Sequence, residues 1–328
     1  MRDLHLSTPT DDWPLHGLID DIRPALSATF DAGQNGAIAT LVHVDGPSPR
    51  SPGAQMFIAS DGAVAGYVSG GCVEASVALI AKDVVAENRV RRVIFGAGSP
   101  YADIKLVCGA RIEIVIEPAQ RGDETWRAVL DARAARQPII RSRDGAGAPM
   151  LLTDAPPGLA GENKDGAFWR RYLPPQRLIV LGGDPVAVAL ARLAHASAVE
   201  VHLVRTYGPP AGPDQFGGHY RSADPASALA DLKPDAWTAV VTTTHDLDAD
   251  HAALRAALPS PAFYVGALGS RRRLADRIDK LQTDGLDWAA VKRLRAPVGL
   301  DIGARTPHEI AIAVLADIIA AARSARPA

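Results

Sequence analysis

The chain has few cysteines, no long hydrophobic run and almost no net charge, and each of these absences argues against a class of function. Its two cysteines, Cys72 and Cys108, form no C-x-x-C motif, and no H-x-x-x-H motif occurs, which argues against a conventional zinc site. No apolar run reaches the roughly 18 residues that a membrane-spanning helix needs. A formal net charge of −2 gives no reason to expect a nucleic acid or an anionic membrane as partner.

The N-terminal segment lacks the features of a secretory signal. Residues 1–12 are polar and acidic, with no basic stretch followed by an apolar one. We therefore expect a cytoplasmic protein, in which a reducing environment disfavours a structural disulfide between Cys72 and Cys108. The 328 residues, 47% hydrophobic and 22% charged, are typical of a soluble globular protein with room for two domains.

The pattern of short apolar runs divides the chain near its middle. Residues 1–153 are expected to form a mixed α/β domain, and residues 154–175, rich in Pro and Gly, a linker. From residue 176 to 328 strands alternate with helices, which predicts a Rossmann-like doubly wound parallel sheet and an α/β fold overall. The predicted strands are residues 37–44, 55–59, 63–68, 91–95 and 111–116, then 177–181, 200–204, 236–242 and 263–268.

The most informative stretch is residues 67–74, Y-V-S-G-G-C-V-E. Cys72 follows a Gly-Gly pair, between a predicted strand and an amphipathic helix whose apolar residues recur every three or four positions from Val73 to Val84. A thiol at such a turn faces backbone N–H groups and the positive end of the helix dipole, which favour a thiolate. Soft metals, sulfur transfer and soft cofactors use that chemistry, whereas a buried, inert cysteine is the structural alternative.

Two other segments of the first domain carry groups suited to the same pocket. The loop of residues 46–54 holds three prolines, which preset its backbone and present Arg50 at little entropic cost. This loop could clamp an anionic group beside Cys72, or it could be a stiff crossover only. The pair Cys108-Gly109 precedes the strand of residues 111–116 and could place a second thiol at the pocket.

The first strand-to-helix turn of the second domain is an incomplete dinucleotide-binding motif. It reads Gly182-Gly183-Asp184-Pro185, so that Asp184 replaces the second fingerprint glycine and its carboxylate would repel phosphate. The second strand is followed by Arg205 and not by an acid for a ribose diol. An NAD(P)-dependent oxidoreductase with a reactive Cys72 is the alternative function, for which His245-Asp246 would be the nearby acid–base pair.

Two helix starts in the second domain are also informative. Ser270 and Arg271 begin a basic run at a predicted helix N-terminus, which suits a phosphate or, alternatively, forms a solvated basic face. The last helix has strong start signals, with Thr306 as N-cap, Pro307 as the first helical residue and Glu309 completing a capping box.

Taken in order, these segments resemble the XdhC/CoxI-type molybdenum-cofactor maturation and insertion chaperone family. The matching stretches are residues 48–54, 68–74, 108–109, 244–246, 266–272, 297–304 and 306–311. The resemblance implies that residues 1–153 bind the molybdenum cofactor transiently, as molybdopterin or its dinucleotide form. It also implies assistance with cofactor sulfuration and with insertion into a xanthine dehydrogenase or aldehyde oxidoreductase-type molybdoenzyme.

The resemblance further implies an accessory chaperone, not an enzyme, that forms a homodimer. Its expected partners are the large subunit of the client molybdoenzyme and a cysteine desulfurase as sulfur donor. Two turns depart from the family pattern, residues 182–185 and 205–207, which puts nucleotide binding in the Rossmann mode in doubt. Dimerisation or client docking are then the expected roles of the second domain.

Residues and resemblance together give a set of candidate site residues and no catalytic residue. Cys72 is the candidate molybdenum ligand, with hydrogen bonding to the cofactor or a transient sulfur relay as other roles. If the cofactor carries a nucleotide, its phosphates could use the second domain. The candidate cofactor-binding residues are Arg50, Ser69, Gly70, Gly71, Cys72, Cys108, Gly109, Ser270 and Arg271.

Overall fold

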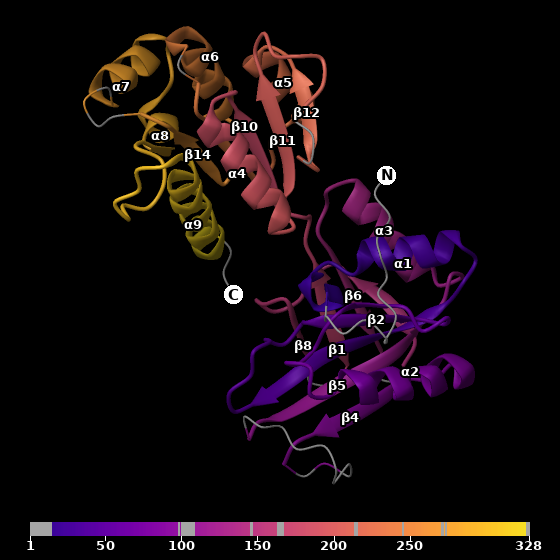
Figure 1. Cartoon of the computed structure of the whole chain (residues 1–328). Coiled ribbons are helices and arrows are strands. Elements are labelled where there is room, and N and C mark those ends of the chain that lie inside the picture. Colours follow the sequence, from indigo (N-terminus) through magenta and orange to yellow (C-terminus); the bar gives the residue numbers. More distant parts are fainter. Residues whose placement is uncertain are drawn as a thin grey trace. The chain divides into compact units, whose positions relative to one another are not determined.

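The computed structural model describes residues 15–97, 99, 109–144, 147–162, 167–212, 216–244, 246–269, 272 and 274–325. The chain forms two compact units that divide between Pro174 and Pro175 (Figure 1). The fold class is α/β, as expected, with antiparallel sheets in the first unit and a parallel sheet in the second. Among the described residues, no helix combines the length and apolar character that crossing a membrane requires.

The N-terminal unit contains two antiparallel sheets with helices packed on them. The larger sheet has the strand order β3-β2-β1-β5-β4 and the smaller one the order β7-β6-β9-β8. Their described elements are η1 (Leu15–Leu18), α1 (Arg23–Asp31), β1 (Gly36–Asp45), β2 (Gln55–Ala59), β3 (Val64–Gly66), α2 (Glu74–Glu87), β4 (Arg91–Phe95), β5 (Arg111–Ala119), α3 (Glu124–Ala134), β6 (Ile139–Arg143), β7 (Pro149–Leu152), β8 (Ala160–Glu162) and β9 (Phe168–Tyr172).

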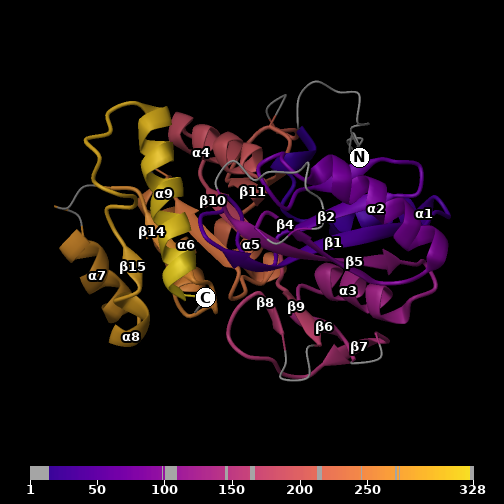
Figure 2. The same cartoon turned by 90° about the horizontal axis from the view of Figure 1, so that it is seen from below.

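Strand β1 is buried on both faces because helices cover both sides of its sheet. Ala39 and Leu41 pack with Val77 of α2, whereas Ile38 packs into a second cluster with Trp126 of α3. Figure 2 shows the strands β1 and β5 between α2 and α3. A strand covered on both faces reads as a continuous apolar run, which explains the compact hydrophobic pattern at residues 37–44.

The segment of residues 154–175, expected to be a linker, contains β8 and β9. Both strands belong to the smaller sheet, in which β9 pairs antiparallel with β6 and with β8. Trp169 and Tyr172 of β9 are buried, at 1% and 4% exposure. Composition misled the prediction here, because the prolines flank the strands and the arginines of β9 hydrogen-bond to nearby carbonyl groups.

The C-terminal unit is the doubly wound parallel sheet that the alternating pattern predicts. Its strand order is β12-β11-β10-β13-β14-β15, and every pairing is parallel. Helices α4 and α9 cover one face, and α5 and α6 the other. The described elements are β10 (Arg177–Leu181), α4 (Pro185–Ala196), β11 (Glu200–Arg205), β12 (His219–Ser222), α5 (Pro225–Leu232), β13 (Thr238–Thr242), α6 (Leu247–Ala257), β14 (Tyr264–Ala267), α7 (Leu274–Thr283), α8 (Trp288–Val291), β15 (Leu294–Arg295) and α9 (Pro307–Ala325).

This strand order is the 3-2-1-4-5-6 arrangement of dinucleotide-binding domains, with the switch point between β10 and β13. The crevice at that point lies beside the Gly182-Gly183 turn. The predicted start of α9 is confirmed, since the Thr306 amide donates to the Glu309 carboxylate at 2.9 Å and the Glu309 amide donates back to the Thr306 hydroxyl at 3.3 Å.

Candidate functional site

The turn between β3 and α2 presents an accessible thiol next to open backbone. Cys72 is a free, exposed cysteine, so the alternative of a buried, inert thiol is wrong. Gly70 and Gly71 are exposed as well, and a Cβ built on Gly71 would meet no atom within 4 Å. Gly71 has a φ of +95°, which a side chain would strain. The amides of both glycines have no hydrogen-bond acceptor within the described parts of the chain.

A buried carboxylate holds this turn from the inside. The Glu74 side chain is 7% exposed and accepts from the amides of Val68 at 3.2 Å, Ser69 at 2.7 Å and Val73 at 3.2 Å. The Ser69 hydroxyl also donates to it, at 2.7 Å, and accepts from the Cys72 amide at 3.2 Å. Glu74 and Ser69 therefore fix the turn, while the two glycines and the thiol stay exposed.

This arrangement changes the role of one predicted site residue and adds another. Ser69 is 4% exposed and directs its hydroxyl at Glu74, so it supports the turn and does not face a ligand. From the sequence, Glu74 is expected only to satisfy the N-terminus of the helix, whereas in the structure it reaches back to the amides that precede the helix. The signal available was an acid two positions after the cysteine, at the first residue of the helix, where a carboxylate can reach back to preceding amides.

The proline-rich loop lies against the glycine–cysteine turn. A Cβ built on Gly70 would lie 3.5 Å from Cγ of Pro49, so the two loops are neighbours. Arg50 donates from Nη2 to Asp20 Oδ1 at 2.6 Å, and its guanidinium lies 5.5 Å from the centre of the Tyr67 ring. Asp20 is largely exposed, so water screens this ion pair. Arg50 is thus placed next to the turn, with most of its N–H donors still available.

Of the second thiol–glycine pair, the structure describes Gly109, which lies two residues before β5. Gly109 has a φ of +71°, and no atom would lie within 4 Å of a Cβ built on it. Its neighbour Ala110 touches the start of the proline-rich loop, since a Cβ on Gly46 would be 3.3 Å from Cα of Ala110. Cys108 itself lies outside the residues that the structure describes, so its position relative to Cys72 stays a prediction.

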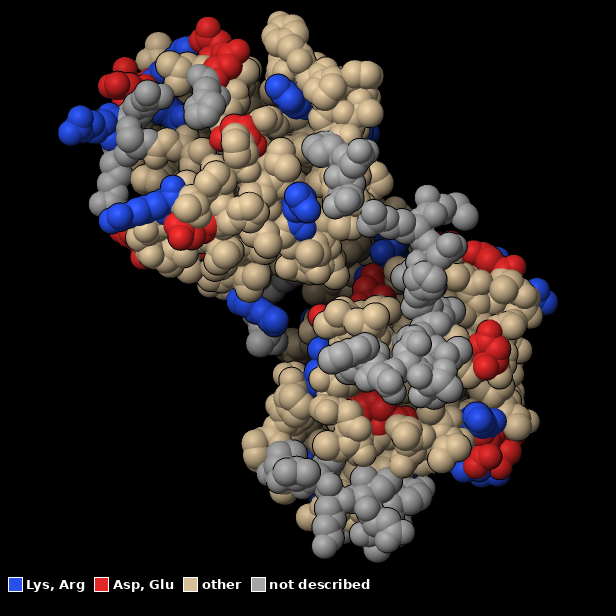
Figure 3. Space-filling view, in the orientation of Figure 1, with Lys and Arg blue, Asp and Glu red and all other residues tan. Residues whose placement is uncertain are grey.

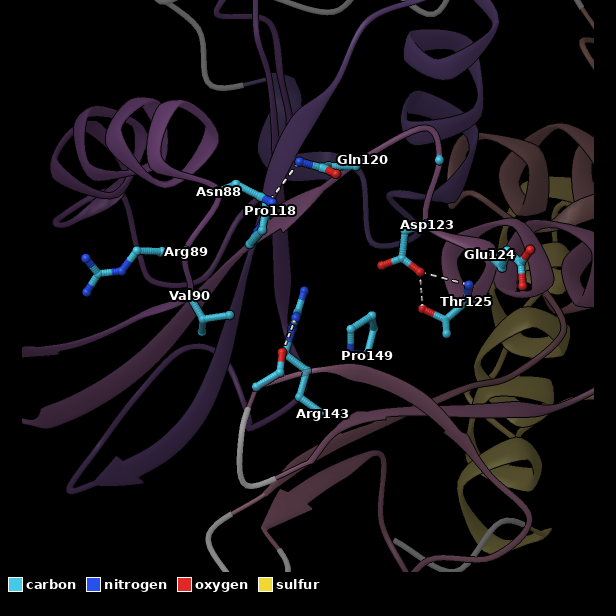
Figure 4. Close-up of a pocket in the computed structure, with 12 residues that line it drawn as sticks. Asn88, Arg89, Val90, Pro118, Gln120, Asp123, Glu124, Thr125, Arg143 and Pro149 are labelled. Atoms are coloured by element: carbon cyan, nitrogen blue, oxygen red, sulfur yellow. Dashed lines mark hydrogen bonds between the residues drawn. The ribbon is translucent and has the colours of Figure 1, made fainter.

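One cavity in the N-terminal unit lies at the other end of α2, and none of the predicted site residues lines it. It measures about 840 Å³. Figure 4 shows hydrogen bonds among its lining residues: Gln120 donates to Asn88 at 2.7 Å, and Asp123 accepts from the amide of Thr125 at 2.8 Å. Burial would raise the pKa of Asp123, but the Thr125 hydrogen bonds and the charge of Arg141 lower it on balance.

The crevice of the C-terminal unit is smaller, about 350 Å³, and its phosphate position is filled by the protein itself. The Asp184 carboxylate caps α4 by accepting from the Ala187 amide at 2.8 Å, and it also accepts from the Thr243 hydroxyl at 2.9 Å. Arg205 lies over the turn, since a Cβ on Gly183 would come within 2.4 Å of its Cδ. A pyrophosphate could not use the start of α4 in the manner of a dinucleotide-binding domain.

Three residues of the predicted phosphate and acid–base sites cannot be placed. Ser270, Arg271 and His245 lie outside the described residues. Within the described part of the chain, no group of three or more His, Cys, Asp and Glu side chains is arranged to hold a metal ion.

The fold and the site define a class: a Rossmann-like domain preceded by an antiparallel domain that exposes a cysteine after two glycines. A model of the XdhC and CoxI family matches residues 30–96, and a model of the XdhC Rossmann domain matches residues 178–318. The chain also shares 35% identity over 304 residues with the molybdenum cofactor insertion chaperone PaoD of Escherichia coli strain K12, covering 92% of this chain and 89% of that protein. The chain belongs to the XdhC and CoxI family.

Two further proteins are similar to this chain over most of their length. The chain is 26% identical over 332 residues to a protein of Bacillus subtilis strain 168 described as a probable xanthine dehydrogenase subunit, covering 90% of this chain and 95% of that one. A crystal structure described as a xanthine dehydrogenase from Bacillus halodurans superposes with a TM-score of 0.73 at 25% identity, covering 92% and 96% of the two chains. The two-unit fold is therefore shared with a solved structure.

Proposed function

We propose that this protein binds the molybdenum cofactor transiently at the glycine–cysteine turn, assists its sulfuration and inserts it into a xanthine dehydrogenase or aldehyde oxidoreductase-type enzyme. The relation to PaoD supports the class of function. The observation that carries the site is the exposed thiol of Cys72 beside two open glycine amides and the Arg50 loop. The cofactor is cargo in this scheme, and the protein acts as an accessory chaperone with no turnover of its own.

The side chains present fit such a cargo. A molybdenum held by a pterin dithiolene is a soft, sulfur-ligated, anionic group. Backbone amides in a nest-like turn and an arginine suit its anionic parts, which assigns Gly70, Gly71 and Arg50 to holding it. Cys72 would ligate the metal, hydrogen-bond the cofactor or relay sulfur. Gly109 and Cys108 would border the same pocket.

The remaining assignments follow from this role. The partners are the large subunit of the client molybdoenzyme and a cysteine desulfurase, which meet the protein in the cytoplasm. Residues 1–153 form the cofactor-binding part, and the Rossmann-like unit contributes contacts other than dinucleotide binding. Ser270 and Arg271 would be used only by a nucleotide-bearing form of the cofactor.

Anaerobic calorimetry with purified molybdenum cofactor tests the proposal. We expect saturable binding at micromolar or lower concentration, weakened about tenfold or more by Arg50→Ala, because a hydrogen bond to a charged group contributes about 1.5–3 kcal/mol. Cys72→Ala is expected to weaken binding as well. The matched control is Arg89→Ala, which removes an exposed arginine at the far end of α2 and should leave the affinity unchanged.

Absence of cofactor binding together with tight NAD(P)H binding would overturn the proposal in favour of a redox function. If Arg50→Ala and Arg89→Ala weakened cofactor binding equally, the cofactor would bind at a site other than the glycine–cysteine turn. A second readout is activation of a cofactor-free client enzyme. The wild type should raise the activity reached at limiting cofactor, and Cys72→Ala should show whether the thiol is needed for transfer beyond binding.

A further inference from the structure

The segment that precedes α1 is held firmly beside the candidate site. Asp21 accepts from Nε of Arg23 at 2.6 Å and from Nε of Arg133 in α3 at 2.8 Å. Ile22 is buried, and a Cβ built on Gly66 of β3 would meet its Cγ2 at 2.8 Å. Two ion pairs and a buried apolar side chain therefore fix this segment against the strand that leads into the glycine–cysteine turn.

Asp20, one residue before this anchor, pairs instead with the proline-rich loop. Its side chain is 74% exposed, and its Oδ1 accepts from Nη2 of Arg50 at 2.6 Å. The Arg50 guanidinium lies 5.5 Å from the centre of the Tyr67 ring, and the Arg50 amide donates to the Ser48 hydroxyl at 3.3 Å. The ring and the loop thus place Arg50, while Asp20 supplies the one carboxylate that it contacts among the described residues.

The charges around the site give no wide positive field. On the face that Figure 3 shows, basic side chains of the described N-terminal unit are few, and acidic side chains lie among them. The formal net charge of the whole chain is −2. An anionic ligand is therefore attracted by individual arginines such as Arg50. A carboxylate that already pairs with such an arginine then has a direct effect on the affinity of the ligand.

We propose that Asp20 is an internal competitor for the anionic ligand of Arg50 and thereby sets how tightly the site holds it, an inference that rests on the proposed function. A ligand that bonds Arg50 through two parallel N–H groups must displace the Asp20 carboxylate or share the guanidinium with it, which brings like charges together. An exposed pair with a single hydrogen bond is weak enough to be displaced. The expected affinity is about three- to fivefold lower than without the competitor, which suits a carrier that has to release its cargo.

The opposite role, in which Asp20 holds Arg50 in place for the ligand, predicts the opposite effect of removing its charge. The geometry argues against that role, because the Tyr67 ring and the prolines of the loop already position Arg50. Asp20→Asn keeps the size of the side chain and an oxygen that can accept from Nη2. This substitution therefore isolates the competing charge.

Chemical modification of Arg50 tests the competition without the cofactor. Phenylglyoxal labels arginine side chains, and mass spectrometry of the Arg50 peptide gives the labelling rate and the concentration of inorganic phosphate that halves it. In Asp20→Asn this concentration should be about three- to fivefold lower than in the wild type. The matched control is Asp83→Asn, which removes an exposed acid that pairs with Arg91 and should leave the protection of Arg50 unchanged.

Three results of this experiment would overturn the competitor role of Asp20. The first is the same half-protecting concentration of phosphate in Asp20→Asn and in the wild type. The second is a higher concentration in Asp20→Asn, which would mean that Asp20 orients Arg50 for the ligand. The third is phosphate that protects Arg50 in neither protein.

Calorimetry with the molybdenum cofactor separates this inference from the proposed function. We expect Asp20→Asn to bind the cofactor about three- to fivefold more tightly than the wild type, with a correspondingly slower release. If the wild type binds the cofactor and Asp20→Asn binds it no more tightly, the competitor role is wrong and the proposed function stands. If neither protein binds the cofactor while phosphate still protects Arg50 better in Asp20→Asn, the proposed function is wrong and the competitor role stands.

Discussion

Two turns of this chain place a Gly-Gly pair between a strand and a helix, and they differ in what covers the glycines. Before α2, Gly70 and Gly71 are exposed and followed by the free thiol of Cys72. Before α4, the side chain of Arg205 lies directly over Gly183. The first turn is open to a ligand, whereas the second is occupied by the protein's own side chains.

The position of one acid distinguishes the two turns. Glu74 is the first residue of α2 and reaches back under its turn to the amides of Val68 and Ser69. Asp184 stands one residue before α4 and caps the helix where a phosphate would bind. An acid beneath the turn supports exposed glycine amides, while an acid at the helix start competes for the ligand position. A Gly-Gly pair alone therefore does not indicate a binding site.

The largest effect is expected from removing the acid beneath the open turn. Glu74→Ala leaves the amides of Val68, Ser69 and Val73 without their acceptor, in a largely buried position. We expect a loss of about 3 kcal/mol in the free energy of unfolding of the N-terminal unit, since each unsatisfied buried group costs roughly 1–3 kcal/mol. Denaturant titration followed by circular dichroism measures the loss, and cofactor binding should weaken in parallel.

The matched control for this change lies in the same helix. Glu87→Ala removes an exposed acid that pairs with Arg91 one turn away, and it should change stability much less than Glu74→Ala. If the two variants lost equal stability, Glu74 would not be the support of the turn. If Glu74→Ala lost stability but bound the cofactor normally, the geometry of the open turn would be irrelevant to binding.

A smaller effect is expected at the filled turn. Asp184→Ala removes the N-cap of α4 and the acceptor for the Thr243 hydroxyl. We expect a loss of about 1–2 kcal/mol in the free energy of unfolding of the C-terminal unit, as for other N-cap substitutions. Cofactor affinity measured by calorimetry should be unchanged, in contrast to Glu74→Ala. A cofactor affinity that fell as far as in Glu74→Ala would contradict the functional difference between the two turns.

Much of this difference could be anticipated from local sequence. The apolar strand of residues 177–181 and the capping box of Thr306 and Glu309 depend on near neighbours, and both are confirmed. The replacement of a fingerprint glycine by Asp184 also signalled that the second turn was not an ordinary phosphate loop. Such features are visible because their cause lies within a few residues of the effect.

Features that depend on distant contacts were not visible in the same way. Arg50 pairs with Asp20, thirty residues away, and no local pattern connects them. Strand β9 was hidden in a proline-rich stretch because it is stabilised by β6, which precedes it by more than twenty residues. The covering of Gly183 by Arg205 likewise requires the parallel pairing of β10 with β11. Sequence periodicity shows where strands lie, but not which side chains they bring together.

The smallest effect is expected at a third helix start, that of α3, where an acid caps the helix and also pairs with a cation. Asp123 caps α3 through the Thr125 amide and lies 3.1 Å from Arg141. Burial would raise its pKa, but the Thr125 hydrogen bonds and Arg141 lower it on balance below the ordinary value. A lowered folded-state pKa stabilises the fold above the unfolded-state pKa of about 3.9, and this stabilisation is lost as the pH falls through the folded-state value.

Asp123→Asn isolates the charge, because asparagine is an equally good N-cap. At pH 7 the variant should be less stable by only about 0.5 kcal/mol, because the nearly buried Arg141 keeps its second partner, Glu117, and the asparagine amide oxygen can still accept from it. The difference from wild type should shrink as the pH falls below about 4, because protonation then removes the same charge from Asp123. Denaturant titrations at pH 7, 4 and 2 measure this trend. A difference that stayed constant across the series would mean that the charge of Asp123 does not contribute and that the carboxylate acts only as a cap.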